Sequence, residues 1–336
     1  MASEVFALSA GGSEVGVGRF AVIEESTLRS VIAPERAVAV MREAFAADGQ
    51  GKTRVPPVIN LDIPAVRGEF HIKTSYIEGV RHVAVKVASG FYDNPARGLP
   101  SGSGLMALFD ASTGFPVALL LDNGFLTDIR TAAAGALAAD LFARQSLRTI
   151  GMIGSGVQAR LQVRCLATVR SFNRIVAWSP TRAHVEQYCR EMSDAGFDAS
   201  PAESPEEVCR SADLLITATP SRRAIVRGEW LQPGVHVTAL GSDSPGKQEL
   251  DPYCFDRADL VVVDRFAQCA AFGELKHALD AGLLTRNDVH GELGAVAARR
   301  THGRTRDDEI SIVDLTGVGF QDTAIASAAF VLIEGR

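Results

Sequence analysis

Apolar and polar residues alternate along the first third of the chain, which is typical of strands that bury one face. Two helical patterns come first, over residues 24–32 and 34–49, and Pro34 is well placed to begin the second helix. The alternation then predicts strands at 55–61, 69–76, 82–88, 105–110 and 116–122. This part of the chain is therefore predicted to be an α+β unit.

The rest of the chain has a different pattern, in which continuous apolar runs alternate with helical stretches. A helix rich in alanine is predicted over 126–139, with Thr127 or Asp128 as its N-cap. Buried strands are predicted at 149–153, 174–178, 213–219, 235–240, 260–264 and 309–315. Strands that alternate with helices form a parallel sheet. We expect the last strand and a closing helix at 322–332 to return to the first unit.

A glycine-rich turn lies where the strand at 149–153 meets the following helix. Gly154 and Gly156 allow a tight turn and a close approach to a pyrophosphate, and Ala159 is small enough for close packing of helix on sheet. This motif alone also fits an ordinary strand-to-helix turn. A second apolar strand follows about 20 residues later, however, as a Rossmann-type doubly wound sheet requires. The cofactor-binding residues predicted here are Gly154, Ser155, Gly156, Val157 and Gln158.

The residues after the second strand bear on the choice of nicotinamide cofactor. Segment 178–182 lacks the acidic residue that usually binds the ribose hydroxyls of NAD. Ser179, Thr181 and Arg182 could instead bind a 2′-phosphate through hydrogen bonds and charge, which slightly favours NADP on physical grounds. Thr219 ends a later strand at the carboxyl edge, where such sheets bind ligands.

Two of the predicted strands have polar faces, which hold the first candidates for chemistry. Along 69–76, one face carries Glu69, His71, Lys73 and Ser75. Lys86 is flanked on its own face by two alanines, so it is poorly screened and has room for a ligand above it. The alternative is a solvated lysine on an edge strand.

Arg130 and Asp243 are further candidates. Arg130 lies near the start of a helix with small side chains, where its guanidinium can reach a carboxylate or phosphate bidentately. Asp243 lies in a glycine-flanked loop at the carboxyl end of a strand, which is a suitable place for a group that handles a proton. A surface arginine and a turn-forming aspartate are the alternatives.

Composition and charge exclude several classes of partner. Of the 336 residues, 46% are hydrophobic and 22% are charged, and the net charge is -6, so there is no basic field for nucleic acid or an anionic membrane. The five cysteines include no Cys-x-x-Cys pair, which argues for a reducing compartment and against a structural metal. We find no signal-peptide pattern and no apolar run of about 18 residues, and so expect a cytoplasmic protein. Residues 1–18 are expected to be a loose tail.

Five segments along the chain resemble the signatures of the ornithine cyclodeaminase and mu-crystallin family. They are Lys86 between two valines and the segments at 127–134, 153–159, 241–247 and 319–322. The resemblance runs from about residue 20 to the end. It is closest to the group labelled ectoine-utilisation cyclodeaminase-like, which includes iminosuccinate reductase. It implies hydride exchange between a nicotinamide and a carbon–nitrogen double bond beside a carboxylate.

The same resemblance implies roles for particular residues. Arg54, Lys86 and Arg130 would hold the substrate carboxylate and the imine region, and Asp243 would donate or accept the proton. Beside the glycine loop, the residues expected against the cofactor are Ser101, Arg130, Thr219, Gly241, Lys247 and Thr316. A homodimer is implied, with residues 1–128 and 314–336 as the substrate-binding and dimerisation domain and 129–313 as an inserted dinucleotide-binding Rossmann domain.

One difference from a true ornithine cyclodeaminase bears on the substrate. That enzyme needs an acidic group for the distal ammonium of ornithine, whereas here His71 and Lys73 accompany Glu69. Together with the other predicted substrate-binding cations they would form a cationic pocket, which favours a substrate with two carboxylates. We therefore expect reduction of an α-imino dicarboxylic acid, specifically iminosuccinate to aspartate.

Other functions stay open at this point. The same site could work in the oxidative direction, as an amino-acid cyclodeaminase or an amino-acid dehydrogenase. Family members also serve as crystallins and small-ligand binders, although the presence of Lys86, Arg130 and Asp243 together counts against this function. For the cofactor, the resemblance to iminosuccinate reductase implies NADH, so we predict NAD(H), with NADP(H) tolerated.

Overall fold

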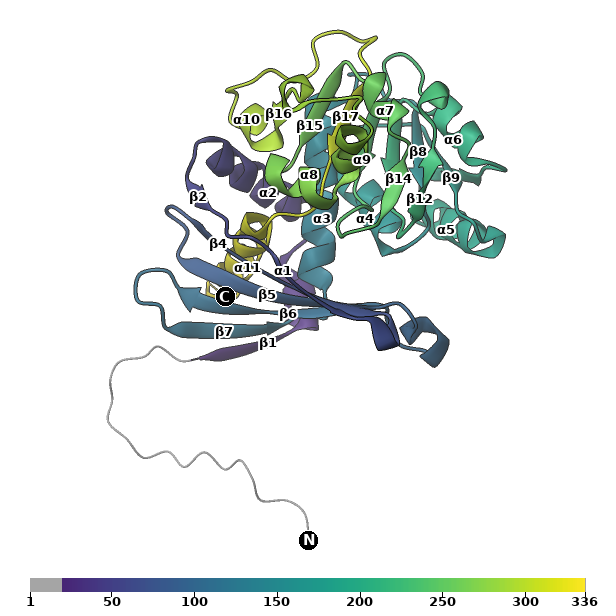
Figure 1. Ribbon diagram of the computed structural model, residues 1–336. Helices are drawn as coiled ribbons and strands as arrows, with labels where there is room; N and C mark the ends of the chain where they lie inside the picture. Colours follow the sequence, from purple (N-terminus) through teal and green to yellow (C-terminus); the bar gives the residue numbers. More distant parts are fainter. Residues whose placement is uncertain (1–19, 336) are drawn as a thin grey trace, which may run out of the picture.

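Two large β-sheets organise the chain (Figure 1). The computed structural model describes residues 20–335, and the tail expected at 1–18 lies outside them. The first third of the chain forms a mostly antiparallel sheet, and the middle and end form a parallel sheet. The predicted α/β class, with a Rossmann-type parallel sheet and a second α+β unit, is confirmed.

The first sheet brings the two predicted polar faces together. Its strands are β1 (Ala21–Glu24), β2 (Thr53–Arg54), β3 (Ile59–Ile63), β4 (Gly68–Ile77), β5 (His82–Phe91), β6 (Gly102–Asp110) and β7 (Pro116–Leu121). Their order is β1-β7-β6-β5-β4-β2, with β3 also paired to β4, and every pair is antiparallel except β1 with β7. Lys73 lies directly opposite Lys86, so both point to the same face of the sheet.

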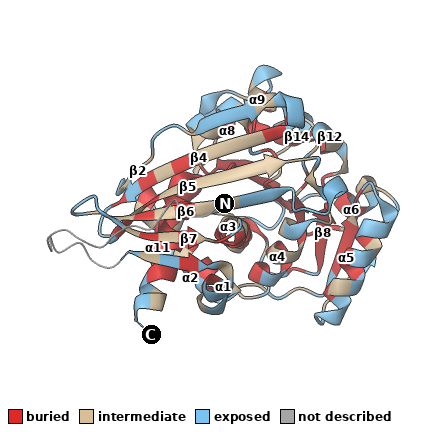
Figure 2. Ribbon diagram, turned by 90° about the horizontal axis from the view of Figure 1, so that it is seen from below, coloured by how far each residue is buried: buried red, intermediate tan, exposed pale blue. Residues whose placement is uncertain are grey.

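Helices cover that inner face, and the other face is open (Figures 1 and 2). The helices are α1 (Glu25–Val31), α2 (Pro34–Gly49), α3 (Phe125–Phe142) and α11 (Gly319–Glu334). Polar pairs as well as apolar contacts seat α11 on the sheet. Ser75 Oγ donates to Thr323 Oγ1 at 2.9 Å, and His82 Nδ1 lies 2.9 Å from Ser327 Oγ. These pairs fix the register of α11 on β4 and β5.

The parallel sheet has the order β10-β9-β8-β11-β13-β17-β15-β16. Its strands are β8 (Thr149–Ile153), β9 (Arg174–Trp178), β10 (Asp198–Pro201), β11 (Leu214–Thr217), β13 (His236–Ala239), β15 (Leu260–Val263), β16 (Gly291–Glu292) and β17 (Ser311–Asp314). The remaining helices are α4 (Val157–Leu166), α5 (Arg182–Asp194), α6 (Pro205–Ser211), α7 (Tyr253–Asp256), α8 (Phe266–Phe272), α9 (Glu274–Asp280) and α10 (Leu293–Ala297). A separate pair is formed by β12 (Arg222–Val226) and β14 (Gln248–Leu250).

The order of strands changes direction between β8 and β11. From β8 the chain continues to β9 and β10 on one side, while β11 lies on the other side. Ligands bind at such a point, in the crevice outside the carboxyl ends of the strands. Gly154 follows β8 with φ +118°, and a Cβ there would lie 2.6 Å from the Ala218 carbonyl oxygen. Both its backbone conformation and its close packing therefore require glycine.

The start of α3 differs from the sequence-based expectation. The helix begins at Phe125, and its N-cap is Gly124. Asp122 Oδ2 accepts a hydrogen bond from the Leu126 amide at 2.9 Å. The expectation that Thr127 or Asp128 caps the helix is wrong, because both residues lie inside its first turn. The domain boundary proposed between residues 128 and 129 also falls within this helix.

Two strands of the first sheet also differ from the expected pattern. β1 is not predicted by the alternation, because it has four residues and leads directly into α1. The strand expected at 55–61 is represented by β3, which starts after Pro56 and Pro57. Proline cannot donate to a ladder of hydrogen bonds, so the pairing begins beyond both prolines.

Residues 20–335 offer neither a membrane-spanning helix nor a metal-binding cluster. No helix there is long and apolar enough to cross a membrane. The same residues contain no cluster of His, Cys, Asp or Glu side chains that could hold a metal ion. The free and buried cysteines are Cys165, Cys189, Cys209, Cys254 and Cys269.

Candidate active site

A cavity of about 190 Å³ lies where the inner face of the first sheet meets α3, α11 and the carboxyl edge of the parallel sheet. Residues that are far apart in the sequence meet there. The sequence-predicted residues that line it are His71, Lys73, Lys86, Arg130, Gln158, Asp243 and Thr316. The structure therefore places the candidate substrate residues beside the glycine loop.

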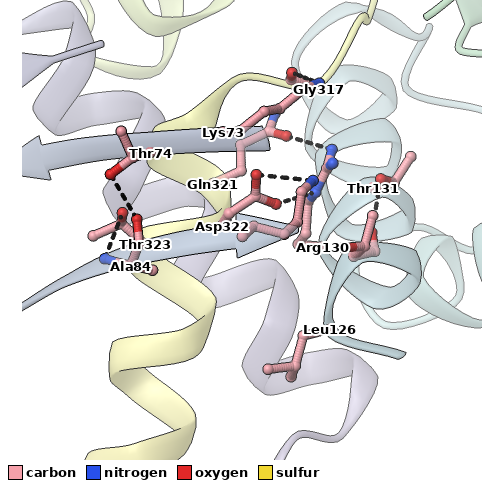
Figure 3. Close-up of polar contacts among 12 residues, drawn as sticks. Lys73, Thr74, Ala84, Leu126, Arg130, Thr131, Gly317, Gln321, Asp322 and Thr323 are labelled. Atoms are coloured by element: carbon pink, nitrogen blue, oxygen red, sulfur yellow. Dashed lines mark hydrogen bonds and ion pairs between the residues drawn. The ribbon is translucent and has the colours of Figure 1, made fainter. Parts of the chain in front are cut away.

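The floor of the cavity is built around one buried carboxylate, that of Asp322 in the first turn of α11 (Figure 3). Asp322 Oδ1 accepts a hydrogen bond from Arg130 Nε at 3.0 Å, and Asp322 Oδ2 lies 3.0 Å from Lys86 Nζ. Each of the three side chains is at most 5% exposed. Burial raises the pKa of Asp322, but Lys86 and Arg130 more than offset this, so the pKa lies below its usual value. Asp322 is therefore an ionised counter-ion to both cations.

Lys86 has a pKa that suits proton transfer. Burial lowers the pKa of Lys86 to about 7; Asp322 opposes the shift, and Arg130 and Lys73 add to it. At neutral pH both protonation states of this lysine are populated, as is required of a group that donates and accepts a proton.

Lys73 lies opposite Lys86 but has different partners. Its Nζ donates to the Gly317 carbonyl oxygen at 2.7 Å and to the Thr316 carbonyl oxygen at 3.4 Å. Burial lowers the pKa of Lys73. Thr316 and Gly317 are held in turn by Asp264, which follows β15 of the parallel sheet. Asp264 Oδ2 accepts hydrogen bonds from the amides of Thr316 and Gly317 at 2.8 and 2.7 Å. The parallel sheet therefore helps to fix the position of Lys73.

The rim of the cavity holds a second carboxylate, that of Asp243. Lys247 Nζ donates to Asp243 Oδ1 at 2.6 Å, and 49% of the Asp243 side chain is exposed. Burial raises the pKa of Asp243, but Lys247 more than offsets this, so the pKa is below its usual value. Asp243 in turn raises the pKa of Lys247 against the effect of burial. Near neutral pH the pair is ionised.

His71 lies at the edge of the cavity and has two polar neighbours. Its Nδ1 lies 2.6 Å from Asn60 Oδ1, and its Nε2 lies 3.3 Å from Glu69 Oε1. The hydrogen bond from His71 is the main reason that the pKa of Glu69 is lowered. A second cavity, of about 590 Å³, is lined by His71, Glu69, Tyr92 and Lys247 among others. His71 therefore stands between the two cavities.

The glycine turn and the N-terminus of α4 fit a dinucleotide. Gly156 is the N-cap of α4, and a Cβ there would meet no described atom within 4 Å, so a ligand can approach the backbone. Val157, at the first helical position, is 58% exposed. The first amides of a helix have no intrahelical partner and attract phosphate oxygens. Gln158 Nε2 donates to the Asp128 carbonyl oxygen at 3.1 Å and so ties α4 to α3 beside the cavity.

Thr219 and Gly241 lie at the same edge of the parallel sheet, after β11 and β13. Their amides donate to the fully buried Glu249 at 2.6 and 2.9 Å. Burial raises the pKa of Glu249 to about 6. Glu249 therefore holds the two loops together, and their amides are already used within the protein.

The residues considered for a 2′-phosphate are engaged elsewhere. Arg182 Nε contacts Glu186 at 2.7 Å, and Arg182 Nη1 contacts Glu203 at 2.8 Å. Ser179 Oγ donates to the Thr181 carbonyl oxygen at 3.2 Å. Two carboxylates beside Arg182 neutralise its charge and would repel a phosphate. This arrangement weakens the physical case for NADP.

Arg54 and Ser101 are not brought to the cavity. Arg54 is exposed, and its Nη1 donates to the carbonyl oxygens of Gly51 and Thr53 at 3.2 and 2.9 Å. It is paired with Tyr76 across β2 and β4, and directly opposed residues share a face. Tyr76 points away from the face that carries Lys73, so Arg54 does as well. Ser101 is exposed in the loop before β6.

Sequence reasoning missed Asp322 and Gln321 as site residues, although their motif was noticed. The signal that could have found them is the adjacent polar pair at the start of a helix whose later residues are mostly apolar. Gln321 Oε1 accepts a hydrogen bond from Arg130 Nη1 at 2.8 Å. Asp128, also missed, lines the cavity, and burial raises its pKa.

Comparison with known proteins shows similarity along nearly the whole chain. The model of the ornithine cyclodeaminase/mu-crystallin family matches residues 21–332. A putative dehydrogenase of Rhizobium meliloti is 44% identical, and the match covers 93% of this chain and 95% of that protein. The match is long enough to include the cavity, the glycine loop and α11.

Two solved structures show the same fold. An archaeal alanine dehydrogenase dimer with bound NAD has a TM-score of 0.88 and 33% identity, over 94% of this chain and 96% of that chain. The iminosuccinate reductase of Paracoccus denitrificans in complex with NAD⁺ has a TM-score of 0.86 and 31% identity, over 94% and 96%. Both sheets of the present chain fall within these matches.

Proposed function

We propose that this protein, which belongs to the ornithine cyclodeaminase/mu-crystallin family, is an oxidoreductase that reduces a small α-imino carboxylic acid with a nicotinamide cofactor. Similar proteins include a dehydrogenase with NAD and an imine reductase with NAD⁺. We assign substrate binding and dimerisation to residues 1–128 and 314–336, and cofactor binding to residues 129–313. The cavity lies where these two parts meet.

The observation that carries this proposal is the convergence of three basic side chains on one cavity. Lys73, Lys86 and Arg130 all line the 190 Å³ cavity, and Asp322 forms ion pairs with two of them. Excess positive charge in a buried cavity favours an anionic ligand. The cavity is small and adjoins the end of α4, where the pyrophosphate of a dinucleotide would bind. A small carboxylate beside a nicotinamide satisfies both conditions.

The chain's own groups can hold the substrate and supply its proton. The bound nicotinamide would supply a hydride to the imine carbon. Arg130 holds the carboxylate, and Lys86, with its pKa of about 7, donates a proton to the imine nitrogen. Asp243 is ionised at the rim and stabilises positive charge on that nitrogen. The hydride and the proton together convert the imine into the amine.

Iminosuccinate, which would yield aspartate, is our specific choice of substrate. Its second carboxylate would lie toward Lys73 and His71, which line the cavity from β4. The second candidate substrate is a smaller monocarboxylic imine. The enzyme would then be an amino-acid dehydrogenase in the oxidative direction. This candidate is favoured by one observation: Lys73 already donates to two carbonyl oxygens, and Arg54 lies outside the cavity, so fewer cations are free than the sequence suggested.

The test is a steady-state assay of NADH oxidation with freshly generated iminosuccinate. Iminopyruvate, pyrroline carboxylates and, in the oxidative direction, ornithine serve as comparison substrates. We expect the highest kcat/KM with iminosuccinate. A higher kcat/KM with iminopyruvate would favour the monocarboxylic imine as the substrate. No rate above background with any imine would overturn the proposed function.

NAD(H) is the proposed cofactor because Arg182 is paired with two glutamates. We expect kcat/KM with NADPH to be no higher than with NADH. Arg182→Ala should leave this ratio unchanged, because the guanidinium is already neutralised by its partners. A preference for NADPH above about tenfold, roughly 1.4 kcal/mol, would contradict the choice.

We also propose that the open face of the first sheet is the interface of a homodimer. That face, seen from below in Figure 2, carries the partly exposed apolar side chains of Ile72, Val85, Val87, Leu105 and Leu119. An apolar face of this kind is more stable when a partner covers it. Light scattering should give twice the chain mass, and Val85→Asp should give a folded monomer. A monomeric wild-type protein would rule the interface out.

A further inference from the structure

We propose that Gln321 is a further substrate-binding residue, whose side-chain amide donates a hydrogen bond to the carboxylate held by Arg130. This inference rests on the proposed function, since it concerns the same cavity. Gln321 lies in the first turn of α11, next to Asp322, and is 1% exposed. It lines the cavity together with Lys86 and Arg130. Its role is distinct from that of Asp322, which is the counter-ion of Lys86 and Arg130.

The orientation of the Gln321 amide is fixed by its neighbour. Arg130 Nη1 donates to Gln321 Oε1 at 2.8 Å (Figure 3). A guanidinium has donors only, so the oxygen of the amide must face Arg130 and the nitrogen must face away from it. The Nε2 group is buried, and no acceptor among residues 20–335 reaches it. An oriented donor without an acceptor is thus part of the cavity wall.

Buried polar groups in folded proteins almost always have a hydrogen-bond partner, because an unpaired one is costly. When such a group lines a cavity that binds a ligand, the ligand is the natural source of the missing partner. Gln321 cannot remove the cost by turning over, since its nitrogen would then face the donors of Arg130. The missing acceptor must therefore come from the contents of the cavity.

The chemistry around Gln321 Nε2 indicates a carboxylate oxygen. Arg130 uses Nε for Asp322 and Nη1 for Gln321, and its Nη2 has no hydrogen bond to any residue in the range 20–335. A planar carboxylate has two oxygens and can accept from two neighbouring donors at once. One oxygen would accept from Arg130 Nη2 and the other from Gln321 Nε2. Because the amide is neutral, it adds a donor without disturbing the balance of charges on Asp322.

The test compares Gln321→Glu and Gln321→Met with the wild-type protein. The glutamate keeps the acceptor for Arg130 but replaces the donor by a negative oxygen, and the methionine removes both functions. Calorimetry of succinate binding to the NAD⁺-loaded protein measures carboxylate affinity without turnover. We expect roughly 10- to 100-fold weaker succinate binding for Gln321→Met, as for loss of one hydrogen bond to a charged group, and a larger loss for Gln321→Glu. The affinity for NAD⁺ should not change.

Gln162→Met is the matched control. Gln162 is as buried as Gln321, but its Nε2 donates to the Thr131 carbonyl oxygen at 3.3 Å and it does not line the cavity. This variant should lose thermal stability and keep the succinate affinity. Unchanged succinate binding in Gln321→Glu, or a change confined to NAD⁺ affinity, would overturn the proposal, as would a wild-type protein that binds no succinate. Succinate binding that depends on Gln321 in a protein that reduces no imine would instead refute the proposed reaction alone.

Discussion

Two carboxylates of the site, Asp322 and Asp243, have surroundings that differ sharply. Asp322 on the floor is 1% exposed and has two cationic partners, each at 3.0 Å. Asp243 on the rim is 49% exposed and has one partner, Lys247, at 2.6 Å. Asp322 belongs to a helix packed on the sheet, whereas Asp243 belongs to a loop after β13. One carboxylate is therefore buried in the core, and the other is half exposed to solvent.

The difference separates a charge that supports the fold from a charge that acts on the substrate. Removing one partner from a buried ion pair leaves an uncompensated charge in a medium of low dielectric constant, which is strongly destabilising. Removing a partner from a half-exposed pair costs little, because water takes its place. Asp322 should therefore be needed for folding and for the position of Lys86 and Arg130. Asp243 should be needed for turnover only.

The largest effect is expected for Asp322→Asn. At pH 6, where Lys86 is protonated, the variant should lose about 3–5 kcal/mol of unfolding free energy, because two buried cations lose their counter-ion. Activity should be lost as well, because Lys86 and Arg130 lose the carboxylate that holds them in position. Urea denaturation monitored by circular dichroism gives the free energy. A loss below about 1 kcal/mol would show that Asp322 contributes no more to stability than an exposed ion pair does.

Lys86→Met should fold and bind the cofactor but lose nearly all turnover. The variant removes one cation from the floor and leaves Asp322 paired with Arg130. In the wild type, the reductive kcat/KM should fall as pH rises above about 7, because Lys86 then loses the proton that it must donate. The oxidative direction should show the opposite slope, because there Lys86 must accept the proton. Any residual rate of Lys86→Met should lack this dependence; wild-type kcat/KM in the variant would remove Lys86 from the mechanism.

For Asp243→Asn we expect a fall in kcat of roughly 10²- to 10³-fold, with little change in cofactor affinity. The variant keeps the shape of the side chain and removes the negative charge at the rim. Its unfolding free energy should fall by less than that of Asp322→Asn, because one buried cation, Lys247 at 10% exposure, loses its partner instead of two. Steady-state kinetics with the preferred imine and a denaturation curve are the two measurements. A loss confined to KM would show that Asp243 binds the substrate and does not stabilise the charge that develops on the imine nitrogen.

The parallel sheet and its glycine turn could be predicted from the sequence because their signals are local. The strands are continuous apolar runs, and the glycine turn needs only residues 154–159 to be recognised. Alternation also showed that Lys73 and Lys86 lie on polar faces. It could not show that they face each other, because register is a property of the paired strands and is not encoded in either one alone.

The charge balance of the site could not be predicted, because it depends on contacts between distant segments. Asp322 meets Arg130 across 192 positions of sequence, through the packing of α11 on the sheet. Without that contact the site was expected to be strongly cationic. Arg54 was expected in the site from the family resemblance, and its face is set by pairing with Tyr76, which the sequence does not reveal. Distant packing, and not local propensity, decides which charges reach the cavity.

The smallest effect is expected for Lys247→Met, which removes the partner of the exposed carboxylate. Lys247 lowers the pKa of Asp243 and burial raises it, so the variant should raise that pKa. Asp243 then becomes protonated at higher pH, and the acid limb of the pH profile of kcat/KM should move upward. Stability should change by less than about 1 kcal/mol, because water can solvate the half-exposed Asp243. An unfolding free energy lowered as much as in Asp322→Asn would show that the rim pair carries structure after all, and that exposure does not distinguish the two carboxylates.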